Sequence, residues 1–78
     1  MQSVMDRIRE VFRSELDDDD LAINLDTSQE DILDWDSLAQ VRLVAAIERE
    51  FGIEFDLSEI EQFITVRDFV DGIGRHSR

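Results

Sequence analysis

Helix-spaced apolar residues between positions 37 and 51 constrain most tightly how this 78-residue chain can fold. The positions that repeat are Leu38, Val41, Val44, Ala45, Ile47 and Phe51. Residues three and four apart share one face of a helix, so this repeat predicts an amphipathic helix from about Ser37 to Phe51. Asp34 or Asp36 can cap its first turn, and Gly52 can end it.

The segments before this helix differ sharply from each other. Residues 3–16 repeat apolar positions at helical spacing, and Ser3 with Asp6 can form a capping box at their start. Residues 17–36 lack such a repeat and contain no basic residue. They predict a long ordered loop whose apolar residues reach the core, with one short turn begun by Ser28 and Asp31.

Two shorter helices are expected after Gly52. Asp56 or Ser58 can begin the first, which would continue through Leu57, Ile60 and Phe63. Thr65 and Asp68 can form a capping box for the second, whose apolar residues are Val66, Phe69, Val70 and Ile73.

The expected fold class is therefore all-α: a small four-helix bundle with a long first loop and a short third helix. Residues 1–78 suffice for one domain, and a flexible tail is expected from residue 73 or 74 to residue 78. His76, the one histidine, would lie in that tail as a solvated side chain.

Charge and composition exclude several function classes. The net charge is −12, with eight arginines and no lysine, so we expect neither a nucleic-acid partner nor a membrane partner. There is no cysteine, which removes disulfides, thiolate metal sites and cysteine nucleophiles. No apolar run is long enough for a membrane span or a signal peptide, so we expect a soluble cytoplasmic protein. We also expect it to be a monomer.

Catalytic and metal-binding motifs are missing as well. A histidine-based triad is not expected, because the one histidine, His76, lies in the expected tail. The aspartates at positions 17–20 do not begin an EF-hand, because Ala22 and Ser28 stand where that loop needs glycine and glutamate. We therefore expect no metal site and no enzymatic activity of the chain itself.

Ser37 is the position with the clearest potential for chemistry. It begins the best-defined helix directly after the long loop, where the helix amides and dipole favour an attached phosphate. The alternative is that Ser37 only helps Asp36 to cap the helix.

The residues around Ser37 resemble the acyl carrier protein family. The run Trp35-Asp36-Ser37-Leu38, the Glu-Phe-Gly end of the helix and the Ile64-Thr65-Val66 step are similar to that family over essentially the whole chain. The resemblance implies a four-helix bundle whose Ser37 receives 4′-phosphopantetheine from coenzyme A through a phosphopantetheinyl transferase. The arm would hold acyl groups as thioesters.

The same resemblance implies partners that load or transfer acyl groups and that dock through basic surfaces. By matching position the docking candidates are Asp36, Leu38, Val41, Arg42, Ala45 and Glu48. Leu38 and Val41 could equally belong to the core, and Glu48 could be a solvated surface residue. Trp35 is expected to anchor the loop on the core rather than to contact substrate.

Some residues depart from the family pattern and leave the cargo open. Arg42 stands where fatty-acid-type carriers usually have glutamate, and Asp34 stands where they usually have glycine. This favours a discrete carrier of a polyketide or other specialised pathway. An aminoacyl or D-alanyl carrier is the first alternative, and an acidic helical interaction module that is never modified is the second.

The negative charge is concentrated before Ser37. Residues 1–16 are neutral, residues 17–36 carry nine acids and no base, and residues 37–78 carry −3. Arg42 and Arg49 balance Glu48 and Glu50, so residues 37–51 are neutral overall. We therefore expect a basic partner surface to approach from the loop side of Ser37.

Overall fold

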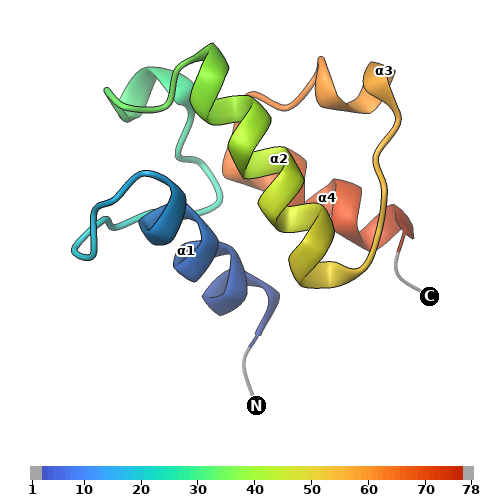
Figure 1. Cartoon of the computed structure of the whole chain (residues 1–78), viewed down its shortest axis with the longest axis horizontal. Helices are drawn as coiled ribbons and strands as arrows, with labels where there is room; N and C mark the ends of the chain where they lie inside the picture. Colours follow the sequence, from blue (N-terminus) through green and yellow to red (C-terminus); the bar gives the residue numbers. More distant parts are fainter. Residues whose placement is uncertain (1–2, 77–78) are drawn as a thin grey trace.

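The computed structural model describes residues 3–76, and its helices confirm the all-α prediction (Figure 1). The helices are α1 (Val4–Glu15), α2 (Ser37–Phe51), α3 (Leu57–Ile60) and α4 (Val66–His76), with a 3₁₀ helix at Gln29–Asp31. Within residues 3–76 the β-type pairing is limited to one isolated antiparallel bridge between Ser28 and Thr65.

The ends of α1 and α2 follow the expected capping residues. Ser3 and Asp6 form the capping box of α1. The Asp36 carboxylate accepts the Ala39 amide proton at 2.9 Å, which identifies Asp36 rather than Asp34 as the cap of α2. Gly52 closes α2 in the left-handed conformation with φ of 66°, a backbone state that glycine adopts without a steric cost.

The two later helices also begin as expected, although the first is shorter. Asp56 and Glu59 form the capping box of α3, and Thr65 and Asp68 exchange the equivalent bonds ahead of α4. Because α3 ends at Ile60, the expectation that it continues through Phe63 was wrong. Phe63 instead lies in the connection to α4, where its ring is buried.

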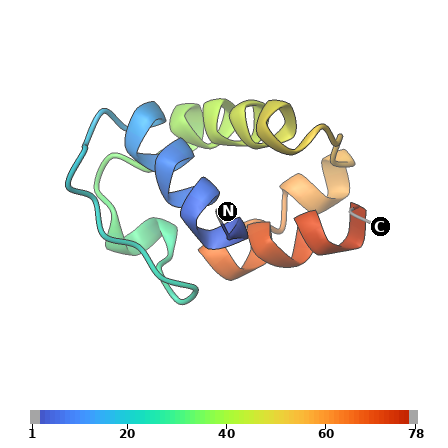
Figure 2. The same cartoon turned by 90° about the horizontal axis from the view of Figure 1, so that it is seen from below.

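The helices enclose a core rich in aromatic rings. Figure 2 shows α2 and α4 on opposite sides, with α1 packed against α2. The rings of Phe12 and Trp35 meet edge-on with centroids 5.0 Å apart, and those of Phe63 and Phe69 lie 4.6 Å apart. Gly72 allows close packing there, since an added Cβ would lie 3.0 Å from a Phe55 ring carbon.

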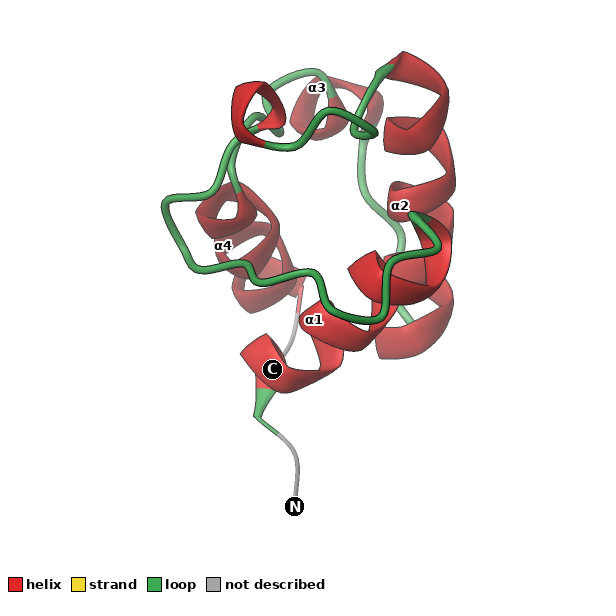
Figure 3. Ribbon diagram, turned by 90° about the vertical axis from the view of Figure 1, so that its left-hand side faces the viewer, coloured by secondary structure: helices red, strands yellow, loops and turns green. Residues whose placement is uncertain are grey.

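The long connection between α1 and α2 (Figure 3) is held by hydrogen bonds to residues of α1 and of α4. Arg13 of α1 donates to the Leu21 carbonyl at 2.8 Å. Farther along, the Val66 amide donates to the Thr27 carbonyl at 2.9 Å and the Arg67 amide to the Leu25 carbonyl at 2.9 Å. These bonds fix a segment with little regular structure, in agreement with the expected ordered loop.

The apolar residues of this loop do not all reach the core. Ile23 is buried, as expected, and Leu21, Leu25 and Ile32 are partly buried. Leu33 is 97% exposed, so the expectation that it reaches the core was wrong. The buried ring of Trp35 follows two residues later and takes the place against the core.

Residues 74–76 of the expected C-terminal tail instead form the last turn of α4. Glu59 of α3 accepts hydrogen bonds from the Arg75 guanidinium, and its Oε2 lies 2.9 Å from Nε2 of His76. The His76 ring also packs edge-on against Phe55 with centroids 5.5 Å apart. Residues 74–76 are thus helical, and His76 is exposed, as expected, but makes these contacts; residues 77–78 lie outside the described range.

The contacts of Glu59 make the α3–α4 junction sensitive to acid. The Asp56 amide, the His76 ring and the Arg75 guanidinium lower the pKa of Glu59 from 4.5 to about 2. A lowered pKa stabilises the fold above the unfolded-state value, and that contribution disappears as the pH falls from about 4.5 to about 2. Glu59→Gln should therefore lower Tm at pH 7 and flatten the loss of Tm below about pH 5.

Thermal unfolding followed by circular dichroism across this pH range measures the effect. Glu61→Gln is the matched control, because Glu61 is exposed and lies two residues along the chain. An equally steep acid dependence in Glu59→Gln and in the wild type would contradict this role of Glu59.

Candidate functional site

Ser37 is an exposed serine whose hydroxyl is not used by the fold. It is the first residue of α2, and its hydroxyl forms no hydrogen bond with any described residue. The capping bond is made by Asp36 alone. The alternative in which Ser37 mainly helps to cap the helix was therefore wrong, and the hydroxyl is accessible from solvent.

The backbone around Ser37 suits a negatively charged substituent. The amides of Ala39 and Gln40 are bound by the side chain and the carbonyl of Asp36, both at 2.9 Å. Those of Ser37 and Leu38 have no partner among the described residues, and they lie at the positive end of the α2 dipole. A phosphodiester on the Ser37 hydroxyl fits this environment.

A hydrogen-bond network one turn into α2 fixes the position of Ser37. Oε1 of Gln40 accepts the indole proton of Trp35 at 2.7 Å, and Nε2 of Gln40 donates to the Phe63 carbonyl at 3.2 Å. The same carbonyl accepts from Gln29 at 3.3 Å. The sequence analysis missed both glutamines, because an isolated glutamine carries no spacing signal that would link it to a distant carbonyl.

Trp35 anchors the end of the long loop, as predicted. It is 3% exposed, and its ring packs against Phe12 of α1 and Phe69 of α4. The indole donor is satisfied by Gln40, which is the usual requirement for burying a tryptophan. The chain therefore enters α2 at a defined place, directly before Asp36 and Ser37.

Leu38 and Val41 lie on the surface. They are 67% and 66% exposed, so the interpretation that places them in the core was wrong. The core face of α2 consists instead of Ala39, Leu43, Val44, Ala46 and Ile47.

The other docking candidates differ in how far their side chains are free. Asp36, Arg42 and Ala45 are exposed, and Arg42 makes a 3.4 Å hydrogen bond to the Glu15 carbonyl. Glu48 is half-buried, and its carboxylate accepts the Phe55 amide proton at 2.8 Å. The interpretation of Glu48 as a solvated surface residue was therefore wrong, since it ties the end of α2 to the next segment.

The first residues of the acidic loop lie close to the start of α2. An open hollow of about 550 Å³ joins them, and it is lined by Glu15, Leu16, Asp17, Leu33, Asp34, Asp36, Leu38 and Arg42. The search for clusters of three or more potential metal ligands found none within residues 3–76. No helix in the same range has the length and apolar character needed to cross a membrane.

Comparison with known proteins identifies this arrangement. A sequence model described as "Phosphopantetheine attachment site" matches residues 6–73, which is most of the chain. The chain belongs to the acyl carrier protein family. The carrier is also similar to the solution NMR structure of a holo acyl carrier protein from Geobacter metallireducens, with 31% identity and a TM-score of 0.86. The match covers 96% of this chain and 86% of that chain.

Membership of this family settles the general role of the carrier. It bears a phosphopantetheine prosthetic group and acts as a protein-bound shuttle rather than as an enzyme. The family interacts with phosphopantetheinyl transferases and with synthases or transferases.

The division of work between Asp36 and Ser37 predicts different effects of their substitution. Asp36→Ala should lower the free energy of unfolding by about 1 kcal/mol, because the Ala39 amide loses its cap. Ser37→Ala should change it by less than about 0.5 kcal/mol, because the hydroxyl supports no contact. Urea denaturation of the unmodified protein measures both values. An equal loss in the two variants would show that Ser37 shares the capping function.

Proposed function

We propose that Ser37 carries the 4′-phosphopantetheine arm and that the carrier presents acyl thioesters in a polyketide or other specialised biosynthetic pathway. The observation that carries the assignment is the exposed, unbonded hydroxyl at the start of α2, within the residues that match the family. When attached, the arm supplies the thiol that this cysteine-free chain lacks.

The protein residues have a positioning role in this proposal. Trp35 and Gln40 hold the loop end and the first turn of α2 together, so Ser37 is presented at a fixed place. Asp36 maintains the helix start without using the serine hydroxyl. The free amides at that end of the helix stabilise the phosphodiester charge next to the Ser37 oxygen.

The specialised pathway is favoured by the residues that depart from the fatty-acid-type pattern. Arg42 replaces the usual glutamate on α2 and is exposed, so an enzyme that recognises that glutamate would meet a positive charge. The mass of the thioester on the native protein identifies the cargo. An amino acid on the arm would replace the acyl assignment with the aminoacyl or D-alanyl one.

Attachment at Ser37 is tested by intact-mass analysis after incubation with coenzyme A, magnesium and a broad-specificity phosphopantetheinyl transferase. The wild type should gain one phosphopantetheine, and Ser37→Ala should gain none. Ser58→Ala is the matched control, since Ser58 is exposed and lies in the first turn of α3, and it should be modified like the wild type. Modification of Ser37→Ala, or none of the wild type, would overturn the assignment.

The acidic loop is proposed to guide basic partner surfaces toward Ser37. Replacing Asp17, Asp18, Asp19 and Asp20 by asparagine should slow association with such a partner by about tenfold at low ionic strength. The difference should disappear at high salt, because exposed charges are then screened. Stopped-flow measurements over a range of salt concentrations test this. Unchanged rates at low salt would restrict the aspartates to a role in solubility.

A further inference from the structure

The outward face of α2 is a single stripe of exposed residues. Its members are Leu38, Val41, Arg42, Ala45 and Arg49, all of them exposed. Their spacing of three, four and seven residues places them on one side of the helix, opposite the core residues Leu43 and Ile47. The stripe combines three apolar side chains with two guanidinium groups.

The glutamates of α2 do not neutralise this stripe. The Glu48 carboxylate is bound to the Phe55 amide, and the Glu50 carboxylate accepts from Arg7 of α1 at 2.8 Å. Both acids therefore serve contacts with other segments. The sequence of α2 contains two acids and two bases, but the charged side chains of the stripe are the two arginines alone.

Arg42 and Arg49 have no carboxylate within ion-pair distance among residues 3–76. Arg7, Arg9, Arg67 and Arg75 do form such pairs. Two unpaired arginines on one stripe are notable in a chain of net charge −12. An exposed guanidinium without an ion pair can still donate to a partner's carboxylate, although Arg42 already makes one 3.4 Å bond to the Glu15 carbonyl.

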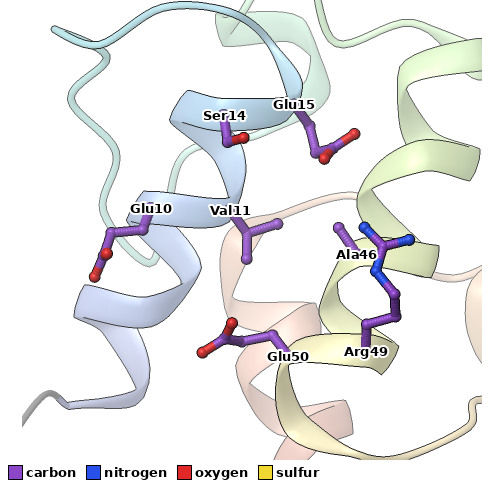
Figure 4. Close-up of a pocket in the computed structure, with 7 residues that line it drawn as sticks. All are labelled: Glu10, Val11, Ser14, Glu15, Ala46, Arg49 and Glu50. Atoms are coloured by element: carbon purple, nitrogen blue, oxygen red, sulfur yellow. The ribbon is translucent and has the colours of Figure 1, made fainter.

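Arg49 borders a groove of about 400 Å³ between α1 and α2 (Figure 4). Its side chain runs back along α2 beside Ala46, whereas Glu50 points toward α1. The Arg49 guanidinium forms no ion pair with the acids that line the groove, Glu15 and Glu50 among them. The Arg49 guanidinium therefore remains available to a partner.

We infer that the stripe docks a protein partner whose surface presents carboxylates opposite Arg42 and Arg49, on either side of an apolar contact with Ala45. This inference rests on the proposed function, because the partner is an enzyme that loads or receives the acyl group. Seven residues of helix separate the two arginines by about 10 Å, which sets the spacing of the partner's carboxylates. The small Ala45 side chain lets the partner approach the helix closely.

At Arg49 the acidic loop does not cancel this preference, whereas Arg42 lines the hollow that it shares with Asp17 and Asp36. Arg49 lies twelve residues beyond Ser37 and thus about 18 Å along α2. That distance exceeds twice the Debye length of about 8 Å at physiological ionic strength. A complementary partner is therefore basic opposite the loop and acidic opposite the Arg49 end of the stripe, and this reversal of sign fixes the orientation in which it docks.

Charge reversal tests the inference. The partner is any purified acyl-loading or acyl-transferring enzyme of the source organism that acts on the wild-type holo-protein. Arg42→Glu/Arg49→Glu should reduce kcat/KM by about tenfold or more through KM, and Arg42→Lys/Arg49→Lys should retain most of it. Arg67→Glu is the control, since Arg67 is exposed on α4 and away from the stripe, and it should leave kcat/KM unchanged.

An unchanged or increased kcat/KM in the charge-reversed variant would overturn the inference, because either result means that the partner presents no acids there. Failure of the proposed function looks different. In that case Ser37 is not modified, or no enzyme acylates the wild-type protein.

A crosslinking measurement does not depend on how the charge-reversed variant folds. The chain has no lysine, so the lysine double variant carries side-chain amines at residues 42 and 49 alone. Carbodiimide coupling should join these amines to partner carboxylates in the complex, as peptide mass spectrometry can map. Arg67→Lys should give no such product. Absence of crosslinks from residues 42 and 49 would contradict the inference.

Discussion

The side-chain amide of Gln40 connects the segments on which the site depends. It accepts from the Trp35 indole at 2.7 Å and donates to the Phe63 carbonyl at 3.2 Å, which joins the loop end, α2 and the α3–α4 connection. Trp35 can be buried against Phe12 because its one polar group is satisfied by this bond. The two Gln40 bonds thus connect the aromatic core to the first turn of α2, next to Ser37.

Some acidic side chains of this carrier form contacts within the fold, and others remain exposed. Glu48 and Glu59 each hold a neighbouring segment, through the Phe55 amide and through Arg75 with His76, and Glu50 pairs with Arg7. The aspartates at positions 17–20 are exposed instead. The exposed acids therefore gather on the loop side of Ser37, while the outward stripe of α2 carries Arg42 and Arg49 and no acid. Net charge alone would describe both surfaces as acidic.

Most of the helical framework could be predicted, because caps and helix ends depend on residues close together in the sequence. Ser3, Asp36, Gly52 and Thr65 act where their local patterns place them. Beyond the length of α3 and the exposure of Leu33, the errors concern which side of a helix is buried and contacts between distant residues. Leu38 and Val41 looked equally suited to the core because α2 is apolar around most of its circumference, so periodicity could not select the buried side. The last turn of α4 is held by Glu59, seventeen residues before His76, and no local pattern reveals that contact.

The position of Ser37 follows from a division of roles among adjacent residues. Trp35 anchors the chain, Asp36 caps the helix, and Gln40 locks the first turn, so each stabilising task is completed without the serine. A group attached to that hydroxyl then replaces water rather than a native contact. On the proposed attachment at Ser37, a small domain of limited stability can accept a large covalent arm at little cost, because the fold does not use that oxygen.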